Sequence, residues 1–309
     1  RPEVITRPGI GEDCAVVDFG SYECVMSTDP ITAAASEIGR LAVHISCNDI
    51  ASNGVEPLGI MLAVMLPEGT TEEQVEEIMK QAGQTAEELG VEIIGGHTEI
   101  TPAVTKPVIV STAIGRGEKW SSQQAENMKP GDYILMTKQA GLEGTGIIAG
   151  DFKDELAGFL TEDEFREAVE MLQKVSVVKE GVIAGKIGTA GMHDITEGGV
   201  LGAVWEMCDI AGTGAEVWVD QIPVAEVTKK ICDRFDIDYL RLISSGSMMI
   251  MVHPDKKEKL EQELSAAGIP VACIGRICEQ EAGICMAVDG GEKIVIAPPA
   301  SDELYKAIS

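Results

Sequence analysis

The stretch Asn48-Asp49-Ile50-Ala51-Ser52-Asn53-Gly54-Val55-Glu56-Pro57-Leu58 joins two segments with clear apolar patterns. Apolar residues at helical spacing before it predict a helix over 37–50, and a continuous apolar run after it predicts a strand over 58–66. The phase of the helix places Asn48 and Asp49 on its inward face. Because an unpaired buried charge is costly, Asp49 needs either a hydrogen-bond partner or a metal ion.

Other short clusters combine small or flexible residues with oxygen ligands, and each lies beside an apolar run. They are Gly9-Ile10-Gly11-Glu12-Asp13, Ser27-Thr28-Asp29-Pro30, Gly95-Gly96-His97-Thr98-Glu99 and His193-Asp194-Ile195-Thr196-Glu197-Gly198-Gly199. Proteins bind Mg²⁺ through a few carboxylates together with the phosphates of a substrate. The clusters therefore predict a site for Mg²⁺ and a nucleoside triphosphate, assembled by the fold from distant parts of the chain.

Each residue type in these clusters suits one part of such a site. Carboxylates at glycine turns and strand ends suit metal ions, and paired glycines let backbone amides approach an anion. His97 can act as a base or as a ligand. A helix expected over 198–211 presents amides and its positive dipole end to phosphate, with Asp194 and Glu197 placed to contact metal or ribose.

Each cluster also has a plain structural interpretation, which the sequence leaves open. Residues 9–13 can form an ordinary loop, residues 27–30 a simple turn, and Asn48-Asp49 a hydrogen-bonded pair at a helix end. His97 can be a hydrogen-bonded structural residue. Thr196 can simply cap the helix that follows it.

Two glycine-rich stretches resemble nucleotide motifs without the context that those motifs need. Gly144-Thr145-Gly146-Ile147-Ile148-Ala149 matches a dinucleotide fingerprint, but no clean acidic partner follows at a second strand end about twenty residues on. Residues 181–186 resemble a P-loop but have the wrong spacing and no following Ser or Thr. Neither stretch favours a Rossmann or P-loop protein.

Composition limits the classes of partner. The 309 residues carry a formal net charge of -27, from 51 acidic and 24 basic side chains. Such a field repels nucleic acid and anionic membranes, so we expect neither as a partner. It also repels ATP, so a nucleotide site on this chain needs divalent cations. The longest strongly apolar stretch, near 58–66, is too short to span a membrane.

The cysteines point to a reducing compartment. They stand at positions 14, 24, 47, 208, 232, 273, 278 and 285. No pair has Cys-x-x-Cys spacing, which disfavours a zinc site. Several lie inside apolar segments, as reduced core cysteines do, so we expect a cytoplasmic protein.

The order of expected elements predicts an α+β, or mixed α/β, protein with two domains. In the first half, strands at 14–19, 23–28, 58–66, 91–95 and 107–115 alternate with helices at 37–50 and 71–89. Residues 119–130 are polar and rich in turn formers, and we take them as a linker between domains 1–118 and 131–309. In the second domain, Thr161-x-x-Glu164 and Asp255-x-x-Glu258 predict helix starts, and 247–252 predicts a buried strand.

Taken in order, the clusters resemble the aminoimidazole-ribotide (AIR) synthase, or PurM, superfamily over nearly the whole chain. Within it, the chain is most similar to the branch of hydrogenase maturation protein HypE and AIR-synthase-related proteins. The residues that carry this resemblance are 48–58, Thr137-Lys138, Leu142-Glu143-Gly144-Thr145, 192–199 and Ser245-Gly246-Ser247-Met248-Met249.

The resemblance implies ATP and Mg²⁺ as cofactors and assigns site residues by position. The implied metal ligands are Asp13, Asp29, Asp49 and Asp194. The implied cofactor-binding residues are Gly11, Ser27, Thr28, Asn48, Gly95, Gly96, Thr98, Thr196, Gly198 and Gly199. The implied catalytic residues are His97, Lys138 and Glu197. His97 stands where relatives carry Asp, and Lys138 falls where HypE-like proteins have a lysine near the reacting group.

The resemblance also implies a quaternary structure and a reaction. The N-terminal domains of two subunits pair their sheets into a barrel-like homodimer core, and a protein of a maturation pathway is a further partner. HypE-type chemistry uses ATP to activate the oxygen of a carboxamide carried on a C-terminal Cys thiol, and dehydration then gives a thiocyanate. This chain departs from that pattern, because its last cysteine is Cys285 and it ends Asp302-Glu303-Leu304-Tyr305-Lys306-Ala307-Ile308-Ser309.

The expected function is therefore HypE-like: ATP- and Mg²⁺-dependent phosphorylation of an amide or acyl oxygen. A different ATP-using enzyme of the superfamily is one alternative, with selenophosphate synthesis disfavoured. A tail-less nucleotide-binding regulator without turnover is another, and a metal-independent scaffold is a third.

Overall fold

The computed structural model describes residues 1–7, 9, 11–32, 37–119, 121–123, 125–280, 285–289 and 291–308. Ile10 of the first cluster and Trp120 and Gln124 of the expected linker lie outside this part of the chain. The described residues form two compact units, Arg1–Ser122 and Gln123–Ser309. Both units combine a sheet with helices, so the prediction of a mixed α/β protein is confirmed.

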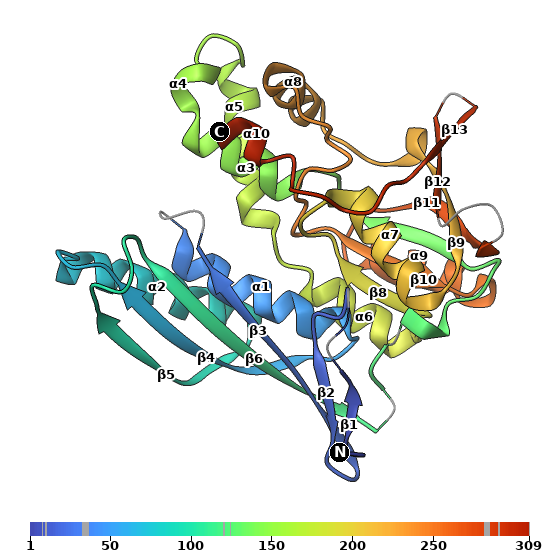
Figure 1. Ribbon diagram of the computed structural model, residues 1–309, viewed down its shortest axis with the longest axis horizontal. Coiled ribbons are helices and arrows are strands. Elements are labelled where there is room, and N and C mark those ends of the chain that lie inside the picture. The colour runs from blue at the N-terminus through green and yellow to red at the C-terminus, as the bar shows by residue number, and fades with distance from the viewer. Residues whose placement is uncertain are drawn as a thin grey trace. The chain divides into compact units, whose positions relative to one another are not determined.

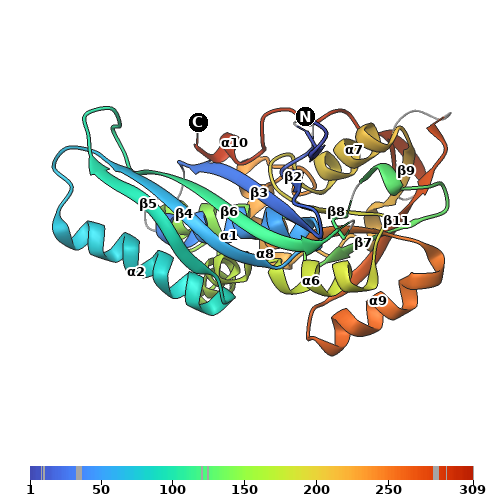
Figure 2. The same ribbon diagram turned by 90° about the horizontal axis from the view of Figure 1, so that it is seen from below.

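Unit 1 is built on a six-stranded sheet with the order β1-β2-β3-β6-β4-β5. Its strands are β1 (Val4–Thr6), β2 (Ala15–Asp18), β3 (Tyr22–Ile31), β4 (Pro57–Leu66), β5 (Glu92–Ile100) and β6 (Val108–Glu118). Helix α1 (Ile38–Ser52) packs on β3 and β6, and α2 (Glu72–Leu89) packs on α1 and β5. Figures 1 and 2 show both helices with the sheet, α2 running along β5.

The helices of unit 1 begin and end where their sequences predict. Thr71 caps α2 through a capping box with Gln74, and Gly90 ends it in the left-handed conformation. These observations confirm the helix predicted over 71–89. Helix α1 is buried almost throughout, and Asn48 and Asp49 are no more than 4 % exposed. The inward placement of both residues is therefore also confirmed.

Two strands of unit 1 run further than their sequences predict. The expected strand over 23–28 continues as β3 to Ile31, and the expected strand over 91–95 continues as β5 to Ile100. The expectation that residues 95–98 follow a strand is wrong. Along their length, β3 pairs with β6 and β5 with β4, and this pairing outweighs the turn preference of Gly and Pro.

Unit 2 is built on a seven-stranded sheet with the order β13-β12-β9-β11-β7-β10-β8. Its strands are β7 (Tyr133–Thr137), β8 (Gly191–Asp194), β9 (Gly214–Trp218), β10 (Met248–Val252), β11 (Val271–Cys278), β12 (Cys285–Asp289) and β13 (Glu292–Val295). Strand β10 is buried along its whole length between β7 and β8, as predicted. Met248 at its start pairs with Asp194 at the end of β8.

The helices of unit 2 are α3 (Leu142–Asp151), α4 (Lys153–Leu156), α5 (Glu162–Glu170), α6 (Val178–Ile187), α7 (Gly199–Ala211), α8 (Glu226–Phe235), α9 (Pro254–Ala266) and α10 (Tyr305–Ile308). The predicted capping box at Thr161 is present at the start of α5. The prediction that Asp255 caps a helix is wrong. Helix α9 begins at Pro254 instead, since proline suits the first turn, where its missing N–H costs nothing.

Candidate functional site

A single hydroxyl joins two carboxylates in unit 1. Ser27 and Asp29 alternate along β3, so both side chains point to the face of the sheet that α1 covers. The Ser27 Oγ atom lies 2.5 Å from Asp49 Oδ2 and 3.0 Å from Asp29 Oδ2. The fold thus brings together Asp29 and Asp49, which are 20 positions apart in the sequence. The family resemblance implies that both are metal ligands.

The proton count of this arrangement favours a cation. The Ser27 hydroxyl has one hydrogen, so it can donate to only one of the two carboxylates at a time. The other carboxylate oxygen then faces a hydroxyl lone pair at hydrogen-bond distance. A cation shared by Asp29 and Asp49 would remove this repulsion, and carboxylate and hydroxyl oxygens are the ligands that Mg²⁺ prefers. The donor set therefore fits Mg²⁺.

Two serines hold Asp29 from behind. Ser46 on α1 has its Oγ 3.4 Å from Asp29 Oδ2 and 2.7 Å from the Oγ of Ser111 on β6. Both serines are fully buried. These contacts fix the Asp29 carboxylate between helix and sheet, which keeps it in place for a ligand.

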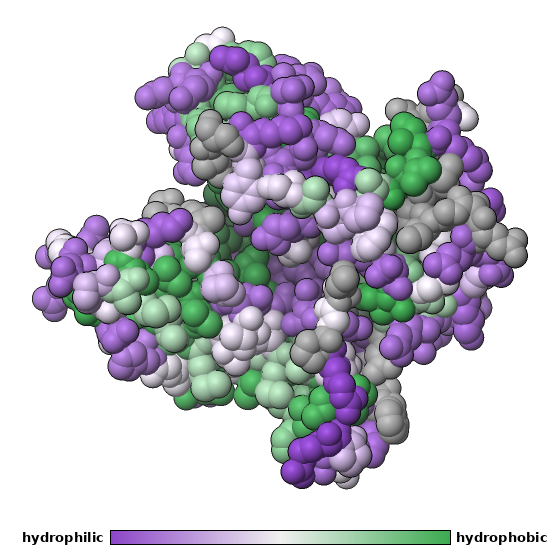
Figure 3. Space-filling view, viewed as in Figure 1, coloured by the Kyte–Doolittle hydropathy of each residue, from purple (hydrophilic) through white to green (hydrophobic). Residues whose placement is uncertain are grey.

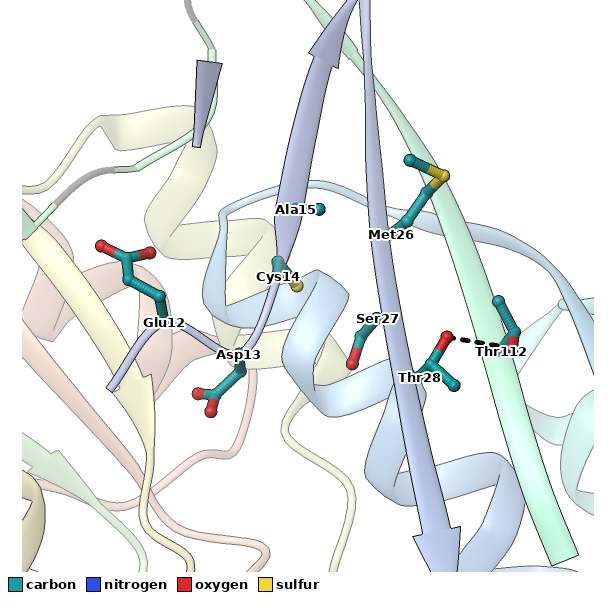
Figure 4. A pocket seen from close by; sticks show the side chains of 8 residues that line it. All are labelled: Glu12, Asp13, Cys14, Ala15, Met26, Ser27, Thr28 and Thr112. Carbon is teal, nitrogen blue, oxygen red and sulfur yellow. Dashed lines mark hydrogen bonds between the residues drawn. The ribbon is translucent and has the colours of Figure 1, made fainter. Parts of the chain in front are cut away.

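A cavity of about 380 Å³ opens beside Ser27. It is lined by Glu12, Asp13, Cys14, Ala15, Met26, Ser27, Thr28 and Thr112 (Figure 4). The Thr28 and Thr112 hydroxyls on its wall lie 3.0 Å apart. Gly11 takes the left-handed conformation, with φ of 70°, in the turn that leads to Glu12 and Asp13 at the cavity. The predicted residues Asp13, Ser27 and Thr28 thus share one pocket.

The Gly95-Gly96-His97-Thr98 residues lie away from this pocket within one chain. Their strand, β5, is the edge strand, and Gly96 aligns with Leu62 on β4, Ser111 on β6 and Asp29 on β3. Three strand spacings separate Gly96 from Asp29, which is about 14 Å. His97 is exposed and lies 3.7 Å from Glu99. Unit 1 alone therefore does not bring these residues to Asp29.

In unit 2, the predicted residues form one turn between β8 and α7. Asp194 is fully buried at the end of β8, Thr196 is half-buried and Glu197 is exposed. Gly198 and Gly199 follow with φ of 83° and 61°. The alternative that Thr196 caps α7 is wrong, because Gly198 is the capping residue and no side chain caps the helix.

Internal acceptors already bind several amides at the start of α7. The Gly198 amide donates to Asp302 Oδ2 at 2.8 Å, and the Gly199 amide donates to the Thr196 carbonyl at 3.1 Å. The Leu201 amide donates to the Leu240 carbonyl at 3.1 Å. These amides are not available to phosphate unless the internal contacts break.

Lys138 is held by three acceptors. Its ammonium group lies 2.7 Å from the Ser176 carbonyl, 2.6 Å from the Gly246 carbonyl and 2.5 Å from Glu180 Oε1. An ammonium group has three N–H donors, so these contacts use all of them. Lys138 also has φ of 53°, unusual for a non-glycine residue. Its geometry matches a lysine that ties loops together.

Glu143 is not among the predicted site residues, although it belongs to the stretch Leu142-Glu143-Gly144-Thr145 that carries the family resemblance. It lies at the start of α3, and its Oε2 atom is buried with no hydrogen-bond partner among the described residues. Burial raises its pKa to about 7; the Ser245 hydroxyl opposes this, and the charges of Glu197, Asp302 and Asp194 add to it. The sequence signal for Glu143 is a charged residue within a run of mostly small and apolar residues, 142–149.

Curated proteins are similar to this chain along most of its length. A relative from Methanocaldococcus jannaschii, whose name assigns it to hydrogenase expression and formation, is 29% identical over 94% of this chain and 88% of its own. Carbamoyl dehydratase HypE of Rhizobium leguminosarum bv. viciae is 25% identical, covering 92% and 83%. Selenide, water dikinase of Carboxydothermus hydrogenoformans is 24% identical, covering 89% and 86%.

Solved structures share the fold. A HypE–HypF complex matches with a TM-score of 0.80 and 23% identity, covering 94% of each chain. HypE in complex with ATP matches with a TM-score of 0.80 and 22% identity, covering 96% of this chain and 90% of that one. Among the described residues, no helix is long and apolar enough to cross a membrane.

Two family descriptions match most of the sequence. The N-terminal domain of AIR synthase related protein matches residues 11–117, and the C-terminal domain of AIR synthase related protein matches residues 129–287. The second match alone covers more than half of the 309 residues. The chain belongs to the AIR synthase related family.

Proposed function

We propose that this protein is an ATP- and Mg²⁺-dependent enzyme that phosphorylates an amide or acyl oxygen. The observation that carries the proposal is the Ser27 hydroxyl held between the carboxylates of Asp29 and Asp49. The adjoining cavity of about 380 Å³ falls within the usual range for small-molecule sites, about 300–1,000 Å³.

The residues of unit 1 divide the work of binding. Asp29 and Asp49 would hold Mg²⁺, and Asp13 is a further carboxylate in the cavity beside Ser27. When bound, Mg²⁺ neutralises the phosphates and the charge that develops during phosphoryl transfer. The Thr28 and Thr112 hydroxyls on the cavity wall can donate hydrogen bonds to phosphate oxygens. Without the cation, the acidic residues would repel ATP.

The favoured acceptor is a carboxamide, as the name of the related carbamoyl dehydratases suggests. Phosphorylation of the amide oxygen would give an O-phosphorylated imidate and ADP. One nitrogen proton is lost when the imidate forms, and loss of the remaining nitrogen proton together with the phosphate group would then give a nitrile-type product. The balance is carboxamide plus ATP to nitrile, ADP and phosphate, with the amide oxygen leaving in phosphate. Hydrogenase maturation is the process we propose for this step.

Two alternatives remain distinct from this proposal. Another ATP-using reaction of the family would keep the Asp29–Asp49 site and change the acceptor. A regulator without turnover would bind ATP and consume no more than one equivalent per site.

The cysteines described as free in this fold are typical of a protein in a reducing compartment, which supports the cytoplasm as the proposed location.

The first test is calorimetric titration of the full chain with ATP, with and without Mg²⁺. Asp49→Asn keeps the side-chain shape but removes one ligand charge, so we expect Mg²⁺-dependent ATP binding to weaken about 30-fold. The control is Glu92→Gln, which removes one exposed charge from the same unit and should change binding less than twofold. Equal ATP affinity with and without Mg²⁺ would contradict the proposal and favour the metal-independent scaffold.

We also propose a homodimer through the sheet face of unit 1 that α1 and α2 leave uncovered. Leu58, Met61, Ile94 and Ile100 on β4 and β5 are each more than 40 % exposed. Figure 3 shows hydrophobic residues gathered over these strands. Apolar patches of this kind mark interaction surfaces. A protein partner is supported by the HypE–HypF complex.

Light scattering tests the dimer. The native protein should have twice the 32.8 kDa mass of one chain. Met61→Asp should shift it to the single-chain mass, because a buried unpaired charge is costly at an interface. Val295→Asp makes the same kind of change at an exposed site on β13 of unit 2 and should leave the dimer intact. A native protein of single-chain mass rules this surface out.

A further inference from the structure

The C-terminal segment is packed into unit 2. After β13, Ile296, Leu304 and Ala307 are all less than 10 % exposed. Asp302 between them is only 5 % exposed, which is unusual for an acidic residue, and among the described residues no basic side chain pairs with it. The segment therefore has a structural attachment whose centre is a buried carboxylate.

Backbone amides from three segments bind this carboxylate. Asp302 Oδ2 accepts from the Gly198 amide at 2.8 Å, and Oδ1 accepts from Ile243 at 3.3 Å and Leu304 at 2.8 Å. Burial raises the pKa of Asp302, while the three amides act in the opposite direction. Hydrogen bonds to an ionised acceptor are stronger than neutral ones. Asp302 therefore links α7 to the loop before β10.

The same loop holds the other end of the turn before α7. The Ile195 amide donates to the Ser247 carbonyl at 2.9 Å, and the Ser244 amide donates to the Ile195 carbonyl at 3.2 Å. Residues 195–198 are thus tied at Ile195 by the loop and at Gly198 by Asp302. Between these ties, Thr196 is half-buried and Glu197 is exposed.

The start of α7 has little room for an external anion in place of Asp302. A Cβ atom added at Gly198 would lie 3.0 Å from Cβ of Pro299, and one at Gly199 would lie 2.7 Å from the Leu240 carbonyl oxygen. The chain's own segments thus close around these glycines. Asp302 supplies the negative charge that the positive end of a helix favours.

We propose that Asp302 is a positioning residue, an internal anion that fixes the Thr196–Glu197 turn for nucleotide binding. The expected effect on nucleotide binding rests on the proposed ATP-dependent function. The contacts of Asp302 do not depend on that function. It makes the C-terminal segment part of the site's support, acting through Gly198 and Ile243 without touching the nucleotide.

The matched control lies one residue away. Glu303 accepts from the Asp238 amide at 2.9 Å and pairs with Lys306 at 2.5 Å, so it also attaches the segment to unit 2. It makes no recorded contact with Gly198 among the described residues. Glu303→Gln therefore weakens the attachment of the segment and leaves the tie to α7 in place, whereas Asp302→Ala removes that tie.

The test compares both variants in the full chain, after circular dichroism shows that they are folded. Asp302→Ala should weaken Mg²⁺–ATP binding about tenfold, because the turn is no longer pre-organised. Added formate, a carboxylate small enough for the space left by the side chain, should restore most of the affinity, and chloride should not. Glu303→Gln should stay within twofold of the native protein. Equal losses in the two variants, or none in Asp302→Ala, would overturn the proposal.

Hydrogen exchange gives a readout that does not need ATP. The amides of residues 196–199 should exchange faster in Asp302→Ala than in the native protein or Glu303→Gln, and formate should slow them again. If the native protein binds no ATP, the proposed function fails while this exchange difference still decides the role of Asp302. Unchanged exchange at these amides would reject the positioning role by itself.

Discussion

Replacing Gly96 by alanine is expected to lower the free energy of unfolding of unit 1 by about 4 kcal/mol. Gly96 has φ of 145°, a conformation that side chains rarely adopt. A Cβ atom there would lie 2.0 Å from the Leu62 carbonyl oxygen on β4. Strand β4 would have to move, which would disturb its pairing with β5. Urea unfolding followed by circular dichroism measures the loss.

The neighbouring glycine provides the control. A Cβ atom at Gly95 would lie 3.8 Å from the Met61 side chain, an ordinary contact. Gly95→Ala should therefore change the stability by less than about 1 kcal/mol. Similar losses in both variants would show that the close approach of β5 to β4 is not the reason for glycine at position 96. A loss of stability in Gly96→Ala but not in Gly95→Ala would indicate that Gly96 is needed for packing against β4, apart from any role in binding phosphate.

Replacing Glu143 by glutamine is expected to stabilise the protein at pH 8 by about 3 kcal/mol, with little effect at pH 4. The pKa of Glu143 rises from 4.5 to about 7 in the folded state, chiefly because of burial. Between these values the folded state binds more protons than the unfolded state, so native stability falls as pH rises from 4.5 to about 7. Glutamine removes the charge and with it this loss.

Denaturant unfolding at several pH values measures the difference. Glu167→Gln, at an exposed position on α5, removes the same charge and should change the pH profile by less than about 0.5 kcal/mol. If the free energies of unfolding of the native protein and of Glu143→Gln differ by the same amount at every pH, Glu143 is not a buried carboxyl that titrates in this range.

Local signals in the sequence were sufficient for the starts of α2 and α5 but not for those of α7 and α9. Thr71 with Gln74 and Thr161 with Glu164 cap helices because their hydrogen bonds are formed within a few residues. Strand ends depend on partners far along the chain. Asp29 and Pro30 stay in β3 because β6 pairs with them through Ser111 and Val110, which no local pattern shows.

The residues of the candidate site divide in the same way, into those that local patterns predict and those that depend on contacts distant in the sequence. The inward phase of α1 placed Asp49 correctly, whereas Ser27 and Asp29 share one face only because β3 runs on to Ile31. The acceptors of the α7 amides could not be predicted, because Asp302 meets Gly198 from 104 residues away. Likewise, the burial of Glu143 depends on the loop around Ser245, which approaches only in the folded unit.

The internal anion at the start of α7 has a consequence for ionic strength. With those amides bound by the chain and a net charge of -27, the proposed function leaves the bound cation to attract the nucleotide against a repulsive background. Dissolved salt screens that background over about 10 Å at 0.1 M. Moderate salt should therefore speed nucleotide association, opposite to the behaviour of proteins that capture phosphate with lysine and arginine.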